Sequence, residues 1–294
     1  MSKSPSLNLN KQEYLQSHIV SSFIHWLNQP EKIAIIRDQA DNYDRENDHC
    51  FEDTYHRFIE WRKYIVNAAT SYRVCTEILK WGGSPIVWGN QKHIDALQDE
   101  HRLHDHLMKA KEVLNKDTIS HDELKGFRFS SGFTKIYTCL SDNFLMYDSR
   151  VSAAFCRLVL LFLIDQKRTS LPAEFVFTYG MGMGSSSNNR NPHLLDYPNY
   201  SAYSKIKFKR LYENTQLGLH SNIKFNWIIS NLAQHPQFNC WTDKGIPEKM
   251  FRLQTGLFML GSDVNHADCP IMIFLGHNTI VCELPQIECY RRSD

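Results

Sequence analysis

The sequence predicts a mainly α-helical protein with short strands and irregular loops. Apolar residues recur at a spacing of three and four positions over most of the chain, which is the period of a half-buried helix. Hydrophobic residues make up 42% and charged residues 22% of the 294 residues, which is the balance of a globular protein with a sizeable core. Glycine and proline clusters at 82–85 and 180–192 interrupt the helical pattern and predict loops.

The N-terminal half is expected to contain helices separated by polar segments. Residues 1–11 are polar and are predicted to be a flexible N-terminus, while 12–294 are interpreted as a single helical domain whose helices can form two lobes flanking a cleft. Pro30 is expected to end the first helix, and the acidic stretch 38–53 is expected to be a loop. Helical periodicity covers three stretches of this half, at 12–28, 54–80 and 92–114.

One helix of the second half is expected at the centre of the protein, because 149–166 is apolar on most sides. Its longest apolar run, 158–164, is much shorter than the ~18 residues that suggest a membrane span, so no membrane partner is expected. The N-terminus lacks the apolar centre of a signal peptide, which favours a cytoplasmic protein. Further helices are expected at 203–217, 222–235 and 247–260, and short strands at 271–275 and 279–282.

Charge and metal-ligating residues exclude several classes of function. The formal net charge of +1 excludes a strongly basic protein that coats nucleic acid, although a local basic patch stays compatible. The eight cysteines contain no C-x-x-C pair and match no zinc or iron–sulfur pattern, so we expect reduced thiols. His101 and His104 share a helix face, but His106 does not. We therefore expect no metal and no cofactor.

The stretch 129–151 carries the most informative pattern in the chain. A glycine-containing turn, Ser130-Ser-Gly-Phe-Thr-Lys135, leads into a helix, and Tyr147-Asp148-Ser-Arg-Val151 opens the apolar helix. Asp148 therefore lies at a helix N-terminus, where a carboxylate is a favoured cap. The simplest interpretation of Asp148 is this capping role.

Residues 124–163 resemble the core of the helix-hairpin-helix DNA glycosylases, particularly those of the 8-oxoguanine type. In that superfamily a hairpin of the form L-P-G-V-G-x-K-T-A precedes a helix, and V-D-T-H-V or V-D-T-R-V opens the next helix. The segment 147–151 matches the second signature well, whereas 130–137 matches the first in part, since Phe133 or Thr134 replaces the second glycine. The resemblance implies a multi-helix glycosylase fold with its hairpin at about 124–151.

The resemblance also implies an enzyme that flips a modified base out of double-stranded DNA and breaks its N-glycosidic bond, leaving an abasic site. Asp148 would stabilise the positive charge that develops at C1′ or help to activate the nucleophile. Lys135 corresponds to the lysine that forms a Schiff base in bifunctional members. Its spacing to Asp148 is shorter than in typical members, so a monofunctional reaction with water and Lys125 as the hairpin lysine stay open. Phosphate contacts are expected from Ser131, Gly132, Thr134 and Arg150.

Two loops are expected to form the pocket for the flipped base, and one basic run is expected to contact phosphate. The alternatives are a helix-terminating turn with buried tryptophans, a plain surface loop, and the solvated face of an amphipathic helix. The G-x-G-x-G at 180–184 is not followed by a helical pattern, which argues against a dinucleotide site. The pocket candidates are Trp81, Trp88, Asn90, Asn188, Asn189 and Arg190, and the basic run comprises Lys205, Lys207, Lys209 and Arg210.

Three functions are carried forward from the sequence. Some divergent members of the superfamily remove glucosylated hydroxymethylcytosine from phage DNA as antiphage defence, and the degenerate hairpin and the polar loop at 185–191 favour that activity. The second is an 8-oxoguanine-type repair glycosylase with AP-lyase activity. The third is a non-catalytic helical protein that binds DNA. A metal-dependent nuclease is not favoured, because the chain has no convincing P-D…E-x-K pattern, and we expect a monomer.

Overall fold

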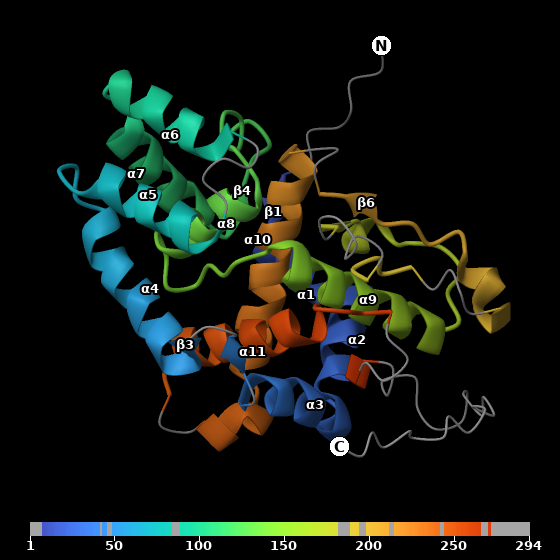
Figure 1. Cartoon of the computed structure of the whole chain (residues 1–294). Coiled ribbons are helices and arrows are strands. Elements are labelled where there is room, and N and C mark those ends of the chain that lie inside the picture. The colour runs from blue at the N-terminus through green and yellow to red at the C-terminus, as the bar shows by residue number, and fades with distance from the viewer. Residues whose placement is uncertain are drawn as a thin grey trace, which may run out of the picture.

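The computed structural model is mainly helical, as the sequence predicts, with short strands between the helices (Figure 1). Its central helix is α9 (Ser149–Asp165), which is buried from Val151 to Ile164. The strands form three two-stranded pairs within the described residues, of which β1–β4 and β5–β6 join segments far apart in sequence, whereas β2 and β3 are neighbours. The structure describes residues 8–41, 43–45, 49–83, 89–181, 189–193, 198–211, 215–241, 244–265 and 270–271.

The N-terminal elements begin earlier than the sequence predicts. The side chain of Asn10 accepts a hydrogen bond from the Glu13 N–H at 3.0 Å and caps the first helix. Residues 9–11, which the sequence assigns to a flexible terminus, therefore belong to regular elements in the structure. Pro30 begins a helix, because its missing N–H costs nothing in a first turn, and that helix shortens the loop expected at 38–53. The elements are β1 (Leu9–Asn10), α1 (Lys11–Gln16), α2 (His18–Leu27), α3 (Pro30–Asp41), β2 (Asp44–Arg45) and β3 (His49–Cys50).

Two long helices expected in the next part of the chain are each divided in two. After Ile65 the Thr70 hydroxyl donates to the Tyr64 carbonyl at 2.6 Å, and such side-chain bonds compete with helical backbone bonds. The second break lies near His101, whose φ of 55° is left-handed. The elements are α4 (Phe51–Ile65), α5 (Ser71–Trp81), α6 (Asn90–Asp99), α7 (Leu103–Leu114), β4 (Thr118–Ile119) and α8 (Ser131–Thr138).

Residues 120–130, just before α8, form turns and extended chain. Where the resemblance predicts a hairpin, the described chain has a turn at Gly126 with φ 87°, then α8, a link over 139–148, and α9. The helix-hairpin-helix fold itself stays a prediction.

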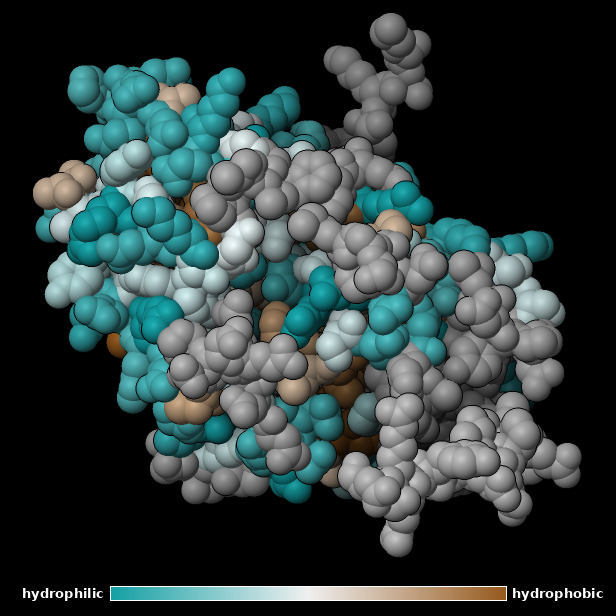
Figure 2. All heavy atoms as spheres, in the orientation of Figure 1, coloured by the Kyte–Doolittle hydropathy of each residue, from teal (hydrophilic) through white to brown (hydrophobic). Residues whose placement is uncertain are grey.

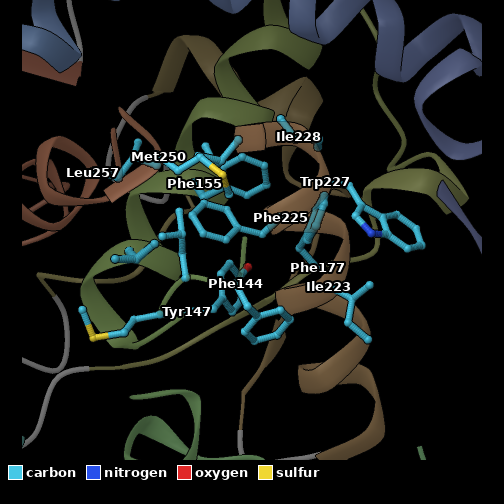
Figure 3. Packing of buried hydrophobic residues seen from close by; sticks show 14 of the residues in the cluster. Phe144, Tyr147, Phe155, Phe177, Ile223, Phe225, Trp227, Ile228, Met250 and Leu257 are labelled. Carbon is cyan, nitrogen blue, oxygen red and sulfur yellow. The ribbon is translucent and has the colours of Figure 1, made fainter. Parts of the chain in front are cut away.

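The core is aromatic and lies around α9 (Figure 3). The Phe155 ring lies 5.9 Å from Phe23, 5.0 Å from Phe177 and 5.1 Å from Phe225, measured between centroids. Edge-on contacts of this kind add to the free energy gained from burying the rings. They join α2, α9 and α10 (Thr215–Ala233) and fix the position at which α9 begins.

The C-terminal half confirms the helix expected at 247–260, which is α11 (Ile246–Leu260). The helix expected at 203–217 is wrong: residues 204–208 are not helical, and β6 (Lys209–Arg210) pairs in parallel with β5 (Thr178–Tyr179). The strands expected at 271–275 and 279–282 lie outside the described residues, apart from position 271. The 3₁₀ segments are η2 (Ala173–Phe175), η4 (Pro198–Tyr203) and η5 (Pro236–Trp241).

Two groups of helices can be followed in Figure 1. On one side α5 packs against α4, α6 and α8, and on the other α11 packs against α3, α9 and α10. In the part of the chain that the structure describes, no helix has both the length and the apolar character needed to cross a membrane.

Candidate active site

A cavity of about 560 Å³ is lined by residues from both groups of helices. Figure 2 shows a hollow near the middle of the face in view, with apolar side chains at depth. The lining residues come from α4, the end of α5, α8, the start of α9 and α11. The cavity has the size of a typical small-molecule pocket, which is ~300–1,000 Å³. It therefore has room for a ligand of nucleoside size.

Lys135 and Asp148 meet at the wall of this cavity. The Lys135 Nζ lies 3.6 Å from Asp148 Oδ2, and the two side chains are only 8% and 10% exposed. The same lysine nitrogen donates to the Ser131 carbonyl at 3.0 Å. A buried charge is costly unless it is paired and hydrogen-bonded, and both conditions hold here. A paired lysine and carboxylate that line a cavity are candidates for chemistry.

The two oxygens of Asp148 have different surroundings. Oδ1 accepts from the N–H groups of Arg150 at 3.1 Å and Val151 at 3.2 Å, so Asp148 caps α9 as the sequence predicts. Oδ2 is the oxygen near Lys135. The capping role is therefore confirmed, and it leaves the second oxygen for another purpose.

Thr134 explains how Lys135 reaches Asp148 across a short spacing. Its hydroxyl accepts from the Tyr147 N–H at 2.8 Å and donates to Asn222 Oδ1 at 2.8 Å. This bond holds the residue before Asp148 against the residue before Lys135. The link at 139–148 therefore returns to α8, and the Lys135 amine is brought to the carboxylate.

Three residues predicted to contact DNA or the base are packed inside the protein. Thr134 and Asn90 are fully buried, and Asn90 Oδ1 accepts from Arg128 Nε at 3.2 Å and Ser130 Oγ at 2.9 Å. A Cβ at Gly132 would lie 2.6 Å from Asn90 Nδ2 and 2.7 Å from Leu79 Cδ2. Gly132 and Asn90 hold α8 against α5 and α6, and Thr134 holds it against α10, so in this conformation the structure buries them away from DNA or a base.

Six of the predicted site residues line this same cavity. Arg190 Nη1 donates to Ser149 Oγ at 2.7 Å, and the Arg150 guanidinium lies 4.5 Å from the centre of the Phe258 ring. These two arginines and Lys135 place three cations beside one carboxylate on the described part of the cavity wall. This balance of charge favours an anionic ligand such as DNA. The six are Trp81, Ser131, Lys135, Asp148, Arg150 and Arg190.

Other predicted residues lie elsewhere. Asn189 is not among the cavity residues, and its carbonyl accepts from the Val264 N–H at 2.8 Å. Lys125 is exposed, and its Nζ lies 2.5 Å from Asp122 Oδ1. The lysine beside Asp148 is therefore Lys135 and not Lys125. Trp88 and Asn188 lie outside the described residues. The basic run is exposed on a turn, which holds Lys205, and on the extended chain that follows, which holds Lys207, Lys209 and Arg210, and not on the expected helix.

Helix α11 forms a wall of the cavity that the sequence did not reveal. Gln254 and Phe258 are four positions apart and so share a helix face. Gln254 is 2% exposed, and its Oε1 accepts from the Met146 N–H at 2.9 Å. A glutamine on the apolar face of a helix was the available signal. The cavity is further lined by Tyr43, Thr54, Phe251, Thr255, Met259 and Ser262.

The phenol of Tyr147, near the cavity, has a structural role. Burial raises the pKa of the Tyr147 phenol well above its ordinary value, and the neighbouring Cys156 raises it further. The Tyr147 hydroxyl donates to the Thr178 carbonyl at 2.7 Å, which ties the residue before Asp148 to β5. Within the described residues, no three His, Cys, Asp or Glu side chains gather in an arrangement that could hold a metal ion.

The fold and the site define a class of helical protein with a buried lysine–aspartate pair on the wall of a cationic, partly aromatic cavity. A scan against protein-family models finds no match to the chain, and searches of curated proteins and of solved structures find none either. The functional argument therefore depends on the cavity and on the motif in 124–163.

Proposed function

We propose that the chain is a DNA glycosylase that accepts an extruded, modified base in this cavity and breaks its N-glycosidic bond. The observation that carries the proposal is the Lys135–Asp148 pair, buried at the cavity wall with 3.6 Å between Nζ and Oδ2. The resemblance predicts these two residues for this reaction from sequence alone. The cations Arg150 and Arg190 on the same wall suit a substrate that carries phosphates.

Breakage of the bond needs stabilisation of positive charge. As the C1′–N bond breaks, its electron pair leaves with the base nitrogen, which gains a proton, and positive charge develops at C1′. The carboxylate of Asp148 stabilises that charge, and the low exposure of the site strengthens the interaction. A water molecule then forms the new C1′–O bond and loses a proton, which leaves the abasic sugar.

Lys135 offers a second route to cleavage of the C1′–N bond. Once its amine has given up a proton, the nitrogen lone pair can attack C1′ in place of water and form a covalent intermediate. The ammonium form is held by the Ser131 carbonyl at 3.0 Å and by Asp148. We propose that hydrolysis is the main reaction and that covalent capture by Lys135 is slower.

The cavity supports a base with a bulky polar substituent. Trp81, Phe251 and Phe258 provide aromatic surface for a planar base, while the hydroxyl groups of Thr54 and Ser262 are suited to hydrogen bonds with a sugar. Glucosylated hydroxymethylcytosine in phage DNA, removed as antiphage defence, is the proposed substrate. The alternative, 8-oxoguanine, is smaller and would leave more of the cavity filled with water.

The proposal is tested by measuring abasic sites in two duplexes, one with glucosylated hydroxymethylcytosine and one with 8-oxoguanine. Wild type, Asp148→Asn and Lys135→Gln are incubated with each DNA in EDTA, and alkali then cleaves the strand at abasic sites. Lys125→Gln is the matched control, because Lys125 is exposed and paired with Asp122. We expect Asp148-dependent cleavage of the glucosylated DNA with full activity in the control.

Each other outcome has a definite meaning. Cleavage of the 8-oxoguanine duplex alone would assign the chain to repair. Cleavage that Asp148→Asn does not reduce would refute the proposed role of the pair. Tight DNA binding without any abasic sites would favour the non-catalytic DNA-binding alternative.

A further inference from the structure

We propose that the segment 204–210, a turn followed by extended chain, is a track for the DNA sugar–phosphate backbone that leads to the cavity. The inference rests on the proposed function and extends it from the reacting nucleotide to the flanking strand. Its central feature is a lysine ladder, which comprises Lys205, Lys207 and Lys209. All three lysines are exposed.

The basic segment begins in a turn and continues as extended chain. Lys205 lies in the turn, in which the Ile206 N–H donates to the Tyr203 carbonyl at 2.9 Å. Ile206 and Phe208, which lie between the lysines, are only 1% and 5% exposed. Successive side chains of extended chain point to opposite sides, so the apolar pair anchors the segment while Lys207 and Lys209 share its outer side. At a rise of about 3.3 Å per residue, these two lysines are about 6.6 Å apart. A row of exposed cations is suited to a linear polyanion.

No acidic side chain in the described part of the chain neutralises the lysines of the ladder. Among the residues that the structure describes, Lys205, Lys207 and Lys209 form no ion pair, and neither does the adjacent Arg210. Several other surface cations do have acidic partners, for example Lys116 with Glu112 at 2.9 Å and Lys125 with Asp122 at 2.5 Å. The ladder is therefore free to exchange its counterions for phosphate groups.

A chain of direct contacts joins the ladder to the cavity. Arg190, which lines the cavity, lies three residues before His193, and the His193 ring nitrogen Nε2 accepts from the Phe208 N–H at 3.0 Å. Phe208 lies between two lysines of the ladder. A strand bound along the ladder would thus be held beside the loop that carries Arg190.

The second connection runs through the short parallel sheet. Lys209 pairs with Thr178, and the Leu211 N–H donates to the Tyr179 carbonyl at 2.8 Å. The next residue, Gly180, approaches so closely that a Cβ there would lie 2.6 Å from the Ser149 Cα. Ser149 follows Asp148, so the ladder and the proposed reacting group are attached to one rigid unit.

His193 is held in one tautomer at this junction. Its Nδ1 lies 2.7 Å from Asn191 Oδ1, and its Nε2 is the acceptor for Phe208, so the ring proton belongs on Nδ1. Burial, together with the smaller effect of the nearby Lys207 and Arg157, lowers the pKa of His193 to about 4. The ring is therefore neutral near pH 7, and the junction adds no charge of its own to the three lysines.

The test measures DNA binding against salt concentration with a short duplex as the probe. The variant Lys205→Gln/Lys207→Gln/Lys209→Gln is compared with wild type and with Lys92→Gln/Lys109→Gln/Lys111→Gln. The control removes three exposed lysines from α6 and α7 and so changes the net charge equally. Each phosphate contact contributes about 0.9 to the slope of log K against log salt. We expect the ladder variant to lower the magnitude of that slope by about 2.7 and the control to leave it within about 0.5 of wild type.

Base release is measured in parallel with enzyme in excess, and the control variant Lys92→Gln/Lys109→Gln/Lys111→Gln should keep the wild-type rate. An unchanged slope in the ladder variant, an equal loss in the control, or no DNA binding by wild type at 50 mM salt would each overturn the track. If the salt slope depends on the ladder lysines but wild type releases no base, the track is supported and the glycosylase proposal is refuted. The two proposals can thus fail separately.

Discussion

The replacement Gly82→Ala tests how closely the position of Lys135 is controlled. Gly82 ends α5 with φ −74° and ψ −1°, a conformation open to any residue, so alanine introduces no backbone strain. A Cβ there would lie 2.8 Å from Lys135 Cδ and 3.1 Å from Cε. Carbon atoms normally pack at about 3.5–4.0 Å, so the lysine side chain must move by about 1 Å.

The size of the effect follows from that displacement. The Lys135 side chain is only 8% exposed, so it has little room to rotate away and keep its amine beside Asp148. A misplacement of about 1 Å can cost about 100-fold in rate. We expect covalent capture by Lys135 to fall by about that factor. Overpacking of this kind also costs about 1–3 kcal/mol in the free energy of unfolding, which thermal melting will report separately.

The assay is single-turnover base release, with borohydride added to trap any imine between Lys135 and the abasic sugar. Gly83→Asn is the matched control, because Gly83 is the next residue and its φ of +66° is one that asparagine tolerates. A Cβ at Gly83 would also meet no described atom within 4 Å. If wild type gives no trapped complex, the covalent route through Lys135 is refuted. Wild-type release and trapping by folded Gly82→Ala would refute the argument that the glycine positions the lysine.

Two other predictions concern stability. Phe155→Ala removes a fully buried ring that contacts Phe23, Phe177 and Phe225. The free energy of unfolding, measured by urea titration, should therefore fall by about 3–5 kcal/mol. A loss below about 1 kcal/mol would contradict this packing. Burial, together with the smaller effect of nearby positive groups, lowers the pKa values of His106, His193 and His220 from 6.5 to about 4. The unfolded chain then binds more protons between pH 6.5 and 4. Stability should therefore be complete above pH 6.5 and should fall toward pH 4, by up to about 1.4 kcal/mol per pH unit for each histidine, and equal urea midpoints at pH 7 and pH 5 would contradict this.

Local patterns predicted the part of the site that is encoded locally. The apolar run 149–166 and the aspartate before it were enough to predict α9 and its cap, because both depend on residues within a few positions of each other. The basic run was misinterpreted as helical although its own pattern has period two, with lysines alternating with Ile206 and Phe208. That alternation is typical of extended chain and was visible in the sequence.

Long-range contacts could not be predicted in the same way. Gln254 bonds the backbone of Met146 across 108 positions, and no local pattern specifies that meeting. Asn90 was assigned to the base pocket because an amide beside a glycine-rich turn is typical of a polar loop. The structure buries it where it accepts bonds from Arg128 and Ser130, which are about 40 residues further along the chain. An amide has the same appearance in the sequence in both settings.

Asp148 shows that a structural and a chemical role can belong to one side chain. Oδ1 caps α9 through the N–H groups of Arg150 and Val151, and Oδ2 lies beside Lys135. Asparagine caps helices as well as aspartate does, so Asp148→Asn should keep Oδ1 in place and remove only the charge facing the lysine. Lys135 keeps its bond to the Ser131 carbonyl at 3.0 Å and borders a cavity large enough for water, which limits the cost of its lost partner.

The expected result for Asp148→Asn is therefore a split between stability and activity. Base release should fall by about 100- to 1,000-fold, the cost of losing one preorganised electrostatic contact, while the free energy of unfolding changes by about 1 kcal/mol. Asp148→Ala should lose a further 0.5–2 kcal/mol, roughly, because alanine cannot cap α9. If Asp148→Asn keeps full activity, and Asp148→Ala loses activity only as far as it unfolds, the carboxylate is a cap alone. Thermal melting and single-turnover release of the two variants together separate the functions of the two oxygens.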